Sequence, residues 1–112
     1  MTKLDYHDAQ NVSNNIIATH EALDEALLKL SALTESMVFA SRNAGMPAAD
    51  SQKALEAVTD GISGLIASRR GFVSAHKHMI IVRNQSNQQV TDFGCLGSGG
   101  PLKAKSPLRV AA

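Results

Sequence analysis

The sequence predicts an all-α fold: an antiparallel hairpin of two long helices that pairs as a homodimeric four-helix bundle, followed by an irregular C-terminal tail. Three observations predict this fold. Aromatic residues make up only 4% of the 112-residue chain and tryptophan is absent, which is typical of helices packed through small and aliphatic side chains. Two long segments repeat such residues at alternating steps of four and three. Glycine and proline lie between these segments and return near the C-terminus.

The first helix is predicted over residues 5–44. From Ala9 to Ala44, its inner face follows an unbroken alternation of four-residue and three-residue steps, which places these positions along one side of a helix. Asp5 is positioned to cap the start, and Asp8 follows in the first turn, where the helix dipole favours acidic side chains.

The stretch RNAGMP predicts where the first helix stops. Arg42 lies in the last turn, Gly45 can take the left-handed conformation that ends a helix, and Pro47 suits the opening of the next one. We therefore expect a turn at residues 45–47 and a second helix over residues 48–88, so that residues 1–89 form the hairpin.

Two parallel stripes run along the second helix. The larger side chains, from Ser51 to Met79, are predicted to face the first helix. The other stripe is shifted by one position and contains only small residues. After Ala54 it continues through the residues that we assign to the dimer surface: Ala57, Gly61, Gly64, Ser68, Gly71 and Ala75. Because each glycine costs a helix about 1 kcal/mol relative to alanine, three on one side predict that another helix approaches closely.

The charge distribution fits an antiparallel hairpin. Residues 1–66 carry four basic and nine acidic side chains, a net charge of −5, whereas residues 67–112 carry seven basic and one acidic, a net charge of +6. With a turn centred near Met46, facing residues have numbers that sum to about 92. This register brings acidic residues of the first helix towards Arg69 and Arg70 and places His20 opposite Phe72.

A lone hairpin would leave a second set of apolar side chains in water. This set is the small-residue stripe together with Ile17, Leu28, Leu33, Val38, Ile66, Val73 and Ile80. A soluble monomer rarely exposes so much apolar surface, and a twofold dimer that closes a four-helix bundle would bury it. We therefore predict a homodimer.

Three polar residues interrupt the inner stripes and suggest an alternative function, a metal-binding or small-ligand-binding bundle. They are His20, Arg69 and His76, of which the two histidines are the candidate metal ligands. No acidic or thiol ligand shares their face at helical spacing, and the Glu-x-x-His pairs of di-iron bundles are missing, so we expect no cofactor.

The tandem Arg69 and Arg70 are the candidate anion-binding residues. Acidic side chains of the first helix are the favoured partners for them. Nucleic-acid binding is disfavoured, because the sequence has neither aromatic stacking platforms nor a continuous basic face.

No residue qualifies as catalytic. Cys95 lies among glycines with no histidine after it, and GSGG lacks the Lys-Ser/Thr ending of a phosphate-binding loop. We therefore expect that the chain is not an enzyme.

Residues 90–112 form the irregular tail, in which isolated apolar residues lie among glycine, proline and lysine. Such a pattern suits a docking peptide whose anchors are Phe93, Leu96, Leu102 and Leu108. Two other interpretations stay open: an uninvolved terminus, or a segment that folds back onto its own bundle.

The function predicted from the sequence is therefore that of a non-enzymatic adaptor, structural or regulatory module with a protein partner. No membrane span is expected, because the longest apolar run is MIIV. The opening residues lack the apolar run of a secretory signal, and the single cysteine suits a reducing compartment, so a cytoplasmic location is expected.

Overall fold

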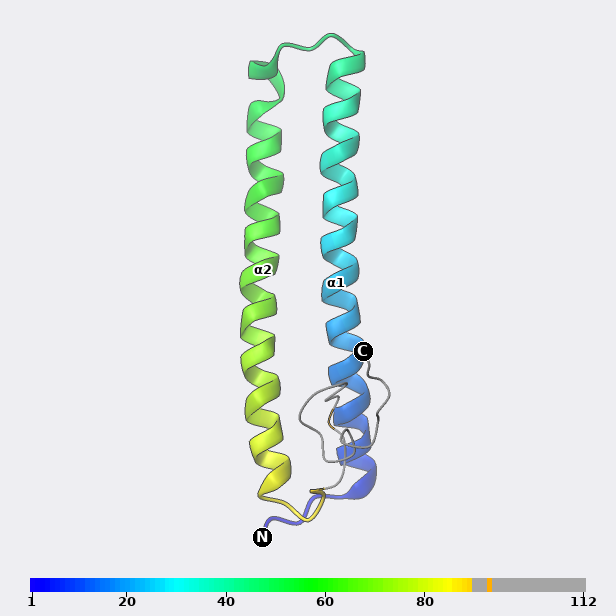
Figure 1. Ribbon diagram of the computed structural model, residues 1–112, viewed down its shortest axis with the longest axis vertical. Coiled ribbons are helices and arrows are strands. Elements are labelled where there is room, and N and C mark those ends of the chain that lie inside the picture. Colours follow the sequence, from blue (N-terminus) through cyan, green and yellow to red (C-terminus); the bar gives the residue numbers. More distant parts are fainter. Residues whose placement is uncertain (90–92, 94–112) are drawn as a thin grey trace, which may run out of the picture. The chain divides into compact units, whose positions relative to one another are not determined.

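The chain folds into two long helices that are joined by a tight turn (Figure 1). Helix α1 spans Tyr6–Asn43 and helix α2 spans Ala48–Asn84 in a computed structural model that describes residues 1–89 and Phe93. Within this described part, an isolated bridge between Thr2 and Ser86 is the one β-type pairing. The predicted all-helical fold and the two-helix hairpin are confirmed.

Asp5 caps the start of α1. One oxygen of its carboxylate accepts hydrogen bonds from the backbone N–H groups of His7, at 2.9 Å, and Asp8, at 3.2 Å. Its own carbonyl accepts the first helical bond, from Ala9. Two of the N–H groups that every helix start leaves without a helical partner are thereby satisfied.

A glycine-terminated cap ends α1. Gly45 adopts the left-handed conformation with φ +65°, its N–H donates to the carbonyl of Arg42, and the N–H of Met46 donates to that of Ser41. This pair of bonds is the Schellman motif. The next helix begins directly after Pro47, whose carbonyl accepts from Asp50.

Replacing Gly45 with alanine is expected to lower the free energy of unfolding by about 1 kcal/mol, because a Cβ atom disfavours positive φ. A Cβ at this position would meet no heavy atom within 4 Å, so the loss comes from the backbone conformation and not from a clash. Urea denaturation would measure it. Asparagine tolerates this conformation better, so equal losses for Gly45→Ala and Gly45→Asn would contradict the explanation.

Helix α2 ends at Asn84, earlier than the end near residue 88 that the sequence predicts. Local polar groups compete with the helical pattern here. The N–H of Gln85 is shared between the carbonyls of Ile81 and Val82, and the hydroxyl of Ser86 donates to the carbonyl of Arg83 at 2.8 Å. The chain then leaves the helix.

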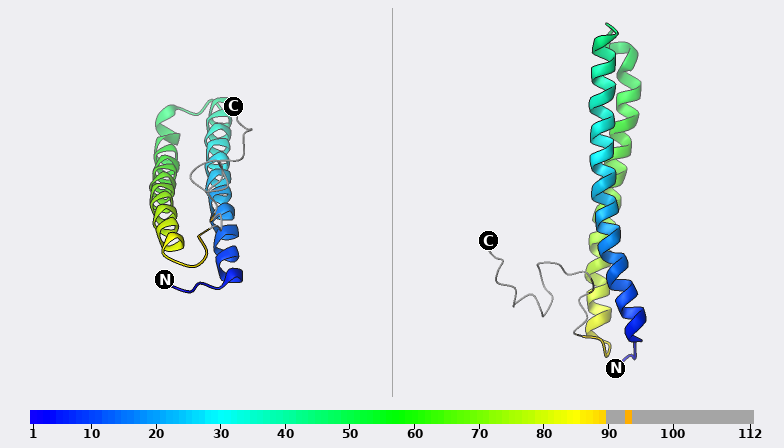
Figure 2. Two further views of the ribbon diagram at one scale, coloured as in Figure 1. Left: turned by 60° about the horizontal axis from the view of Figure 1, so that its bottom comes forward. Right: turned by 90° about the vertical axis from the view of Figure 1, so that its right-hand side faces the viewer.

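The hairpin consists of two compact units, each of which contains part of both helices. The first, which we call the turn unit, is His20–Phe72. The second, the end unit, contains Met1–Thr19 and the described residues from Val73 onward. In the turn unit the two helices lie side by side and run antiparallel (Figures 1 and 2).

The N-terminal residues close the end unit. The backbone N–H of Thr2 donates to the carbonyl of Gln85, and the backbone carbonyl of Thr2 accepts from the N–H of Asn87. Leu4 donates its N–H to the Oδ1 atom of Asn87 at 2.6 Å, and its carbonyl accepts from the side chain of Gln88 at 3.1 Å. These bonds tie the residues before α1 to the residues after α2.

All the buried residues of the described part lie in the end unit: Ala9, Ser13, Ile16, Arg83, Ser86 and Phe93. The larger aliphatic layers of the turn unit are at most half-buried. Two helices alone leave each layer of side chains open to water on both sides. In the end unit, non-helical residues also pack against the helices, and the buried residues lie there. In residues 1–89 no helix combines the length and the apolar character that crossing a membrane requires.

Candidate functional site

The predicted dimer surface lies on the exposed side of α2. Every member of the small-residue stripe, from Ala54 to Ala75, is exposed to solvent. A Cβ atom added at Gly61, Gly64 or Gly71 would meet nothing within 4 Å. The close approach that these glycines predict is therefore not made by any of the described residues.

Apolar side chains also stay exposed around both helices of the turn unit. Leu28 is 66% exposed, Leu33 47% and Ile66 46%, and Val38 and Phe39 are exposed as well. Val73, in the end unit, is exposed, whereas Ile17 and Ile80 are half-buried. No residue of His20–Phe72 is buried, so this unit has no core of its own.

The structure gives His20 and Arg69 neighbours within the turn unit. The imidazole ring of His20 lies edge-on to the ring of Phe72, with 4.8 Å between the ring centroids. The Nε atom of Arg69 donates to an oxygen of Asp24 at 3.1 Å. Both contacts match the register predicted from the turn, and Arg69 has the acidic partner on the first helix that the sequence favours. Arg70 is exposed.

His76 lies in the end unit, where its Nε2 atom is 2.8 Å from the carbonyl oxygen of Phe93. Phe93 has no exposed surface and adopts φ +51°, a left-handed conformation that is strained for an aromatic residue. This predicted docking anchor is therefore held against its own chain. The other anchors, Leu96, Leu102 and Leu108, lie outside the described residues, as does Cys95.

The inner polar residues after Met79 are a feature that the sequence analysis missed. Arg83 is 2% exposed, and its Nε and Nη2 atoms donate to the Oδ1 atom of Asn84 at 3.2 and 3.0 Å. Ser86 is also buried and accepts from the N–H of Gln88. A signal was present, because positions 83 and 86 continue the four-three spacing of the inner stripe beyond Met79.

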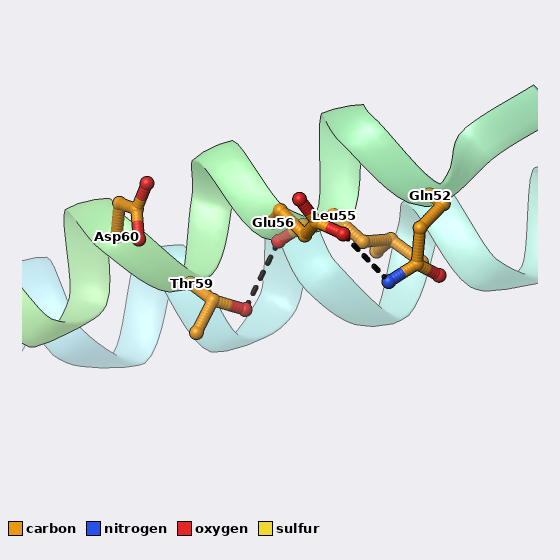
Figure 3. A pocket seen from close by; sticks show the side chains of 5 residues that line it. All are labelled: Gln52, Leu55, Glu56, Thr59 and Asp60. Atoms are coloured by element: carbon orange, nitrogen blue, oxygen red, sulfur yellow. Dashed lines mark hydrogen bonds between the residues drawn. The ribbon is translucent and has the colours of Figure 1, made fainter.

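An open pocket with two carboxylates lies on α2 in the turn unit (Figure 3). It is lined by Gln52, Leu55, Glu56, Thr59 and Asp60. The amide of Gln52 donates to a carboxylate oxygen of Glu56 at 3.0 Å, and the hydroxyl of Thr59 donates to the carbonyl of Leu55. The pocket is a surface depression, and its hydroxyl group donates to the backbone and not to a carboxylate that could act as a base.

Among the described residues, neither candidate metal ligand belongs to a cluster that could hold an ion. Across residues 1–89 and Phe93, no three histidine, cysteine, aspartate or glutamate side chains are grouped closely enough to bind a metal. No protein-family model, curated protein or solved structure matches this chain.

Proposed function

We propose that this chain is a non-enzymatic interaction module, in which the hairpin pairs with a second copy to form a four-helix bundle. The pair then acts as an adaptor, structural or regulatory partner of another protein. The proposal assigns no catalytic role to the histidines and arginines, since His20, Arg69 and His76 each contact a neighbour inside the protein.

A single observation carries the proposal: the 53 residues of His20–Phe72 contain no buried residue. Burying one leucine or isoleucine side chain contributes about 1.5 to 3 kcal/mol, and this contribution offsets the conformational entropy that folding removes. Layers that are only half-buried supply only part of this stabilising contribution. A second hairpin laid on the first would complete these layers.

The small-residue stripe favours a second copy as the covering partner. It contains no charged residue, so two copies can bring these surfaces together without burying a charge. Small side chains also let helix backbones approach closely, and a twofold axis presents the same surface from both chains. Four helices are then closed around one core.

Changing Gly61, Gly64 and Gly71 together to alanine tests the proposal with two opposed effects. Each alanine raises helix propensity, and the described part of the chain leaves room for each methyl group, so the helices themselves should become more stable. In the dimer the added methyl groups would hold the backbones apart. We expect the dissociation constant to rise by about tenfold or more, as sedimentation equilibrium would show.

Ser74→Ala is the matched control, because it raises helix propensity at an exposed position of α2 outside the stripe. It should leave dimerisation unchanged. A wild-type chain that sediments as a monomer at tens of micromolar would refute self-association. Tighter association of the triple variant would refute the assignment of this surface.

A further inference from the structure

A stripe of α1 lies on the same side of the turn unit as the small-residue stripe of α2. Both stripes precede the inner positions of their own helix by one residue, and in an antiparallel pair such positions lie on the same side of both helices. Within the turn unit the α1 stripe consists of Ala22, Ala26, Lys29, Leu33, Ser36 and Ala40. We call these six residues, together with the α2 stripe from Ala54 to Gly71, the small-residue face.

The small-residue face is open to solvent on both helices. All its members are exposed except Ala26, which is half-buried. Two large side chains stand out from it, and both belong to α1: Leu33 is 47% exposed, and the side chain of Lys29 is 77% exposed. The α2 half contains only alanine, glycine and serine. Lys29 is the single charged residue of the face, so its position limits how a second copy can pair there.

The observed register gives the level of each residue along the hairpin. Residues at the same level have numbers that sum to about 92, as the ring contact of His20 with residue 72 shows. By this sum Lys29 lies level with Gly64, and Leu33 lies close to the level of Gly61. The two large side chains of α1 are therefore level with the two glycines in the middle of the α2 stripe.

A second copy can pair through this face in two twofold arrangements. With the two turns at the same end, each α1 lies on the α2 of the other copy, and residues of equal level meet. With the turns at opposite ends, α1 lies on α1 and α2 lies on α2. The two arrangements set different residues against each other, so size and charge decide between them.

Same-end pairing sets large side chains against glycines. Leu33 meets Gly61 of the second copy, and Lys29 meets Gly64. A Cβ atom at either glycine would have no heavy atom of the described residues within 4 Å, so both large side chains find room there. Asp60 lies one helical turn before Gly64, where its carboxylate can meet the ammonium of Lys29 at the edge of the contact. Asp60 is exposed and forms no salt bridge with a described residue.

Opposite-end pairing brings like charges together. A pair that covers the whole face is centred midway between Ala22 and Ala40, at residue 31. The two copies of Lys29 then lie about 6 Å apart along the helices, because each is two residues from the centre. Two ammonium groups so close, with no acid of the face between them, oppose association.

We infer that the second copy pairs with its turn at the same end as the first, so that each α1 lies along the α2 of the other copy. Leu33 packs on Gly61, and the aliphatic stem of Lys29 crosses Gly64 to reach Asp60. The inference rests on the proposed pairing through the small-residue stripe and adds which helix of the second copy that stripe meets.

The distance between the two turns tests the arrangement. Cys95→Ser with Met46→Cys leaves one thiol in each full-length chain for a nitroxide label. Neighbouring helices pack about 8 to 10 Å apart, so same-end turns should place the labels within about 30 Å of each other in pulsed electron paramagnetic resonance. Opposite-end turns would lie about 45 Å apart, since 15 residues separate the turn from the centre in each copy.

Sedimentation of the same sample separates the two proposals. A dimer whose labels are about 45 Å apart would overturn the inference and leave the proposed pairing intact. A chain that stays monomeric would refute both.

Charge exchange tests the contact itself. Lys29→Glu sets a glutamate beside Asp60 of the second copy, and the dissociation constant should rise by about tenfold in sedimentation equilibrium. Adding Asp60→Lys should return it to within about threefold of the wild-type value. Lys53→Glu is the matched control, because it reverses an exposed lysine of α2 outside the face and should leave the dissociation constant unchanged.

Two outcomes of the charge exchange would contradict the inference. In an opposite-end pair, Lys29→Glu replaces one pair of like charges with another, so an unchanged dissociation constant would indicate that arrangement. Lys29 also forms a salt bridge with Glu25 of its own helix, at 3.5 Å. If Asp60→Lys failed to restore association, the loss would come from that broken salt bridge and not from a contact with the second copy.

Discussion

Phe93→Ala is expected to lower the free energy of unfolding by about 3 to 5 kcal/mol, the usual cost of removing a buried phenylalanine ring. Phe93 has no exposed surface, and its left-handed backbone shows that burial outweighs local strain at this residue. Its carbonyl contact with His76 fixes the chain beyond α2 to the helix. Urea denaturation at a fixed protein concentration would measure the loss.

Phe39→Ala is the matched control, since it deletes the same ring from a side chain that is 54% exposed on α1. A loss of about 0.5 kcal/mol or less is expected there. If the two alanine variants lost equal stability, Phe93 would not be the structural anchor that its burial indicates.

Arg83→Glu should cost about 3 kcal/mol or more, because it places a carboxylate at a residue that is only 2% exposed. The native side chain donates two hydrogen bonds to the Oδ1 atom of Asn84. A carboxylate has no proton to donate at neutral pH, so it would face that oxygen with its own lone pairs and bury a negative charge. Thermal or urea unfolding would show the loss.

The same change of charge at Arg70 controls for the effect of net charge. Arg70 is exposed on the same helix, and Arg70→Glu should alter stability by about 0.5 kcal/mol or less. Comparable losses at the two positions would mean that Arg83 contributes through the overall charge and not through its buried contacts.

Local sequence signals predicted the helical elements well. The Asp5 cap, the left-handed Gly45 and the helix start after Pro47 appear as the residues indicate, because each depends on a few neighbouring backbone groups. The register was also predictable, since a short turn relates facing residues by a simple sum. His20 accordingly meets Phe72, and Asp24 meets Arg69.

The end of α2 and the buried residues were not predictable in the same way. The spacing indicated a core between the inner stripes of the two helices, yet members of these stripes such as Leu27 and Leu65 are only half-buried. The buried residues cluster instead where residues 1–4, 85–89 and Phe93 join the helices. Contacts between residues more than eighty positions apart, such as Leu4 with Asn87, leave no local pattern in the sequence.

The sequence by itself therefore determined two long helices, their caps, their antiparallel register and the side of α2 that carries only small residues. These depend on backbone propensity and on periodic spacing, which are written into short stretches of chain. Only the tertiary structure decided which residues are buried, that Arg83 and Phe93 are among them, and that the turn unit has no core. Burial depends on how many chain segments surround a side chain, and distant segments are brought together only by the fold.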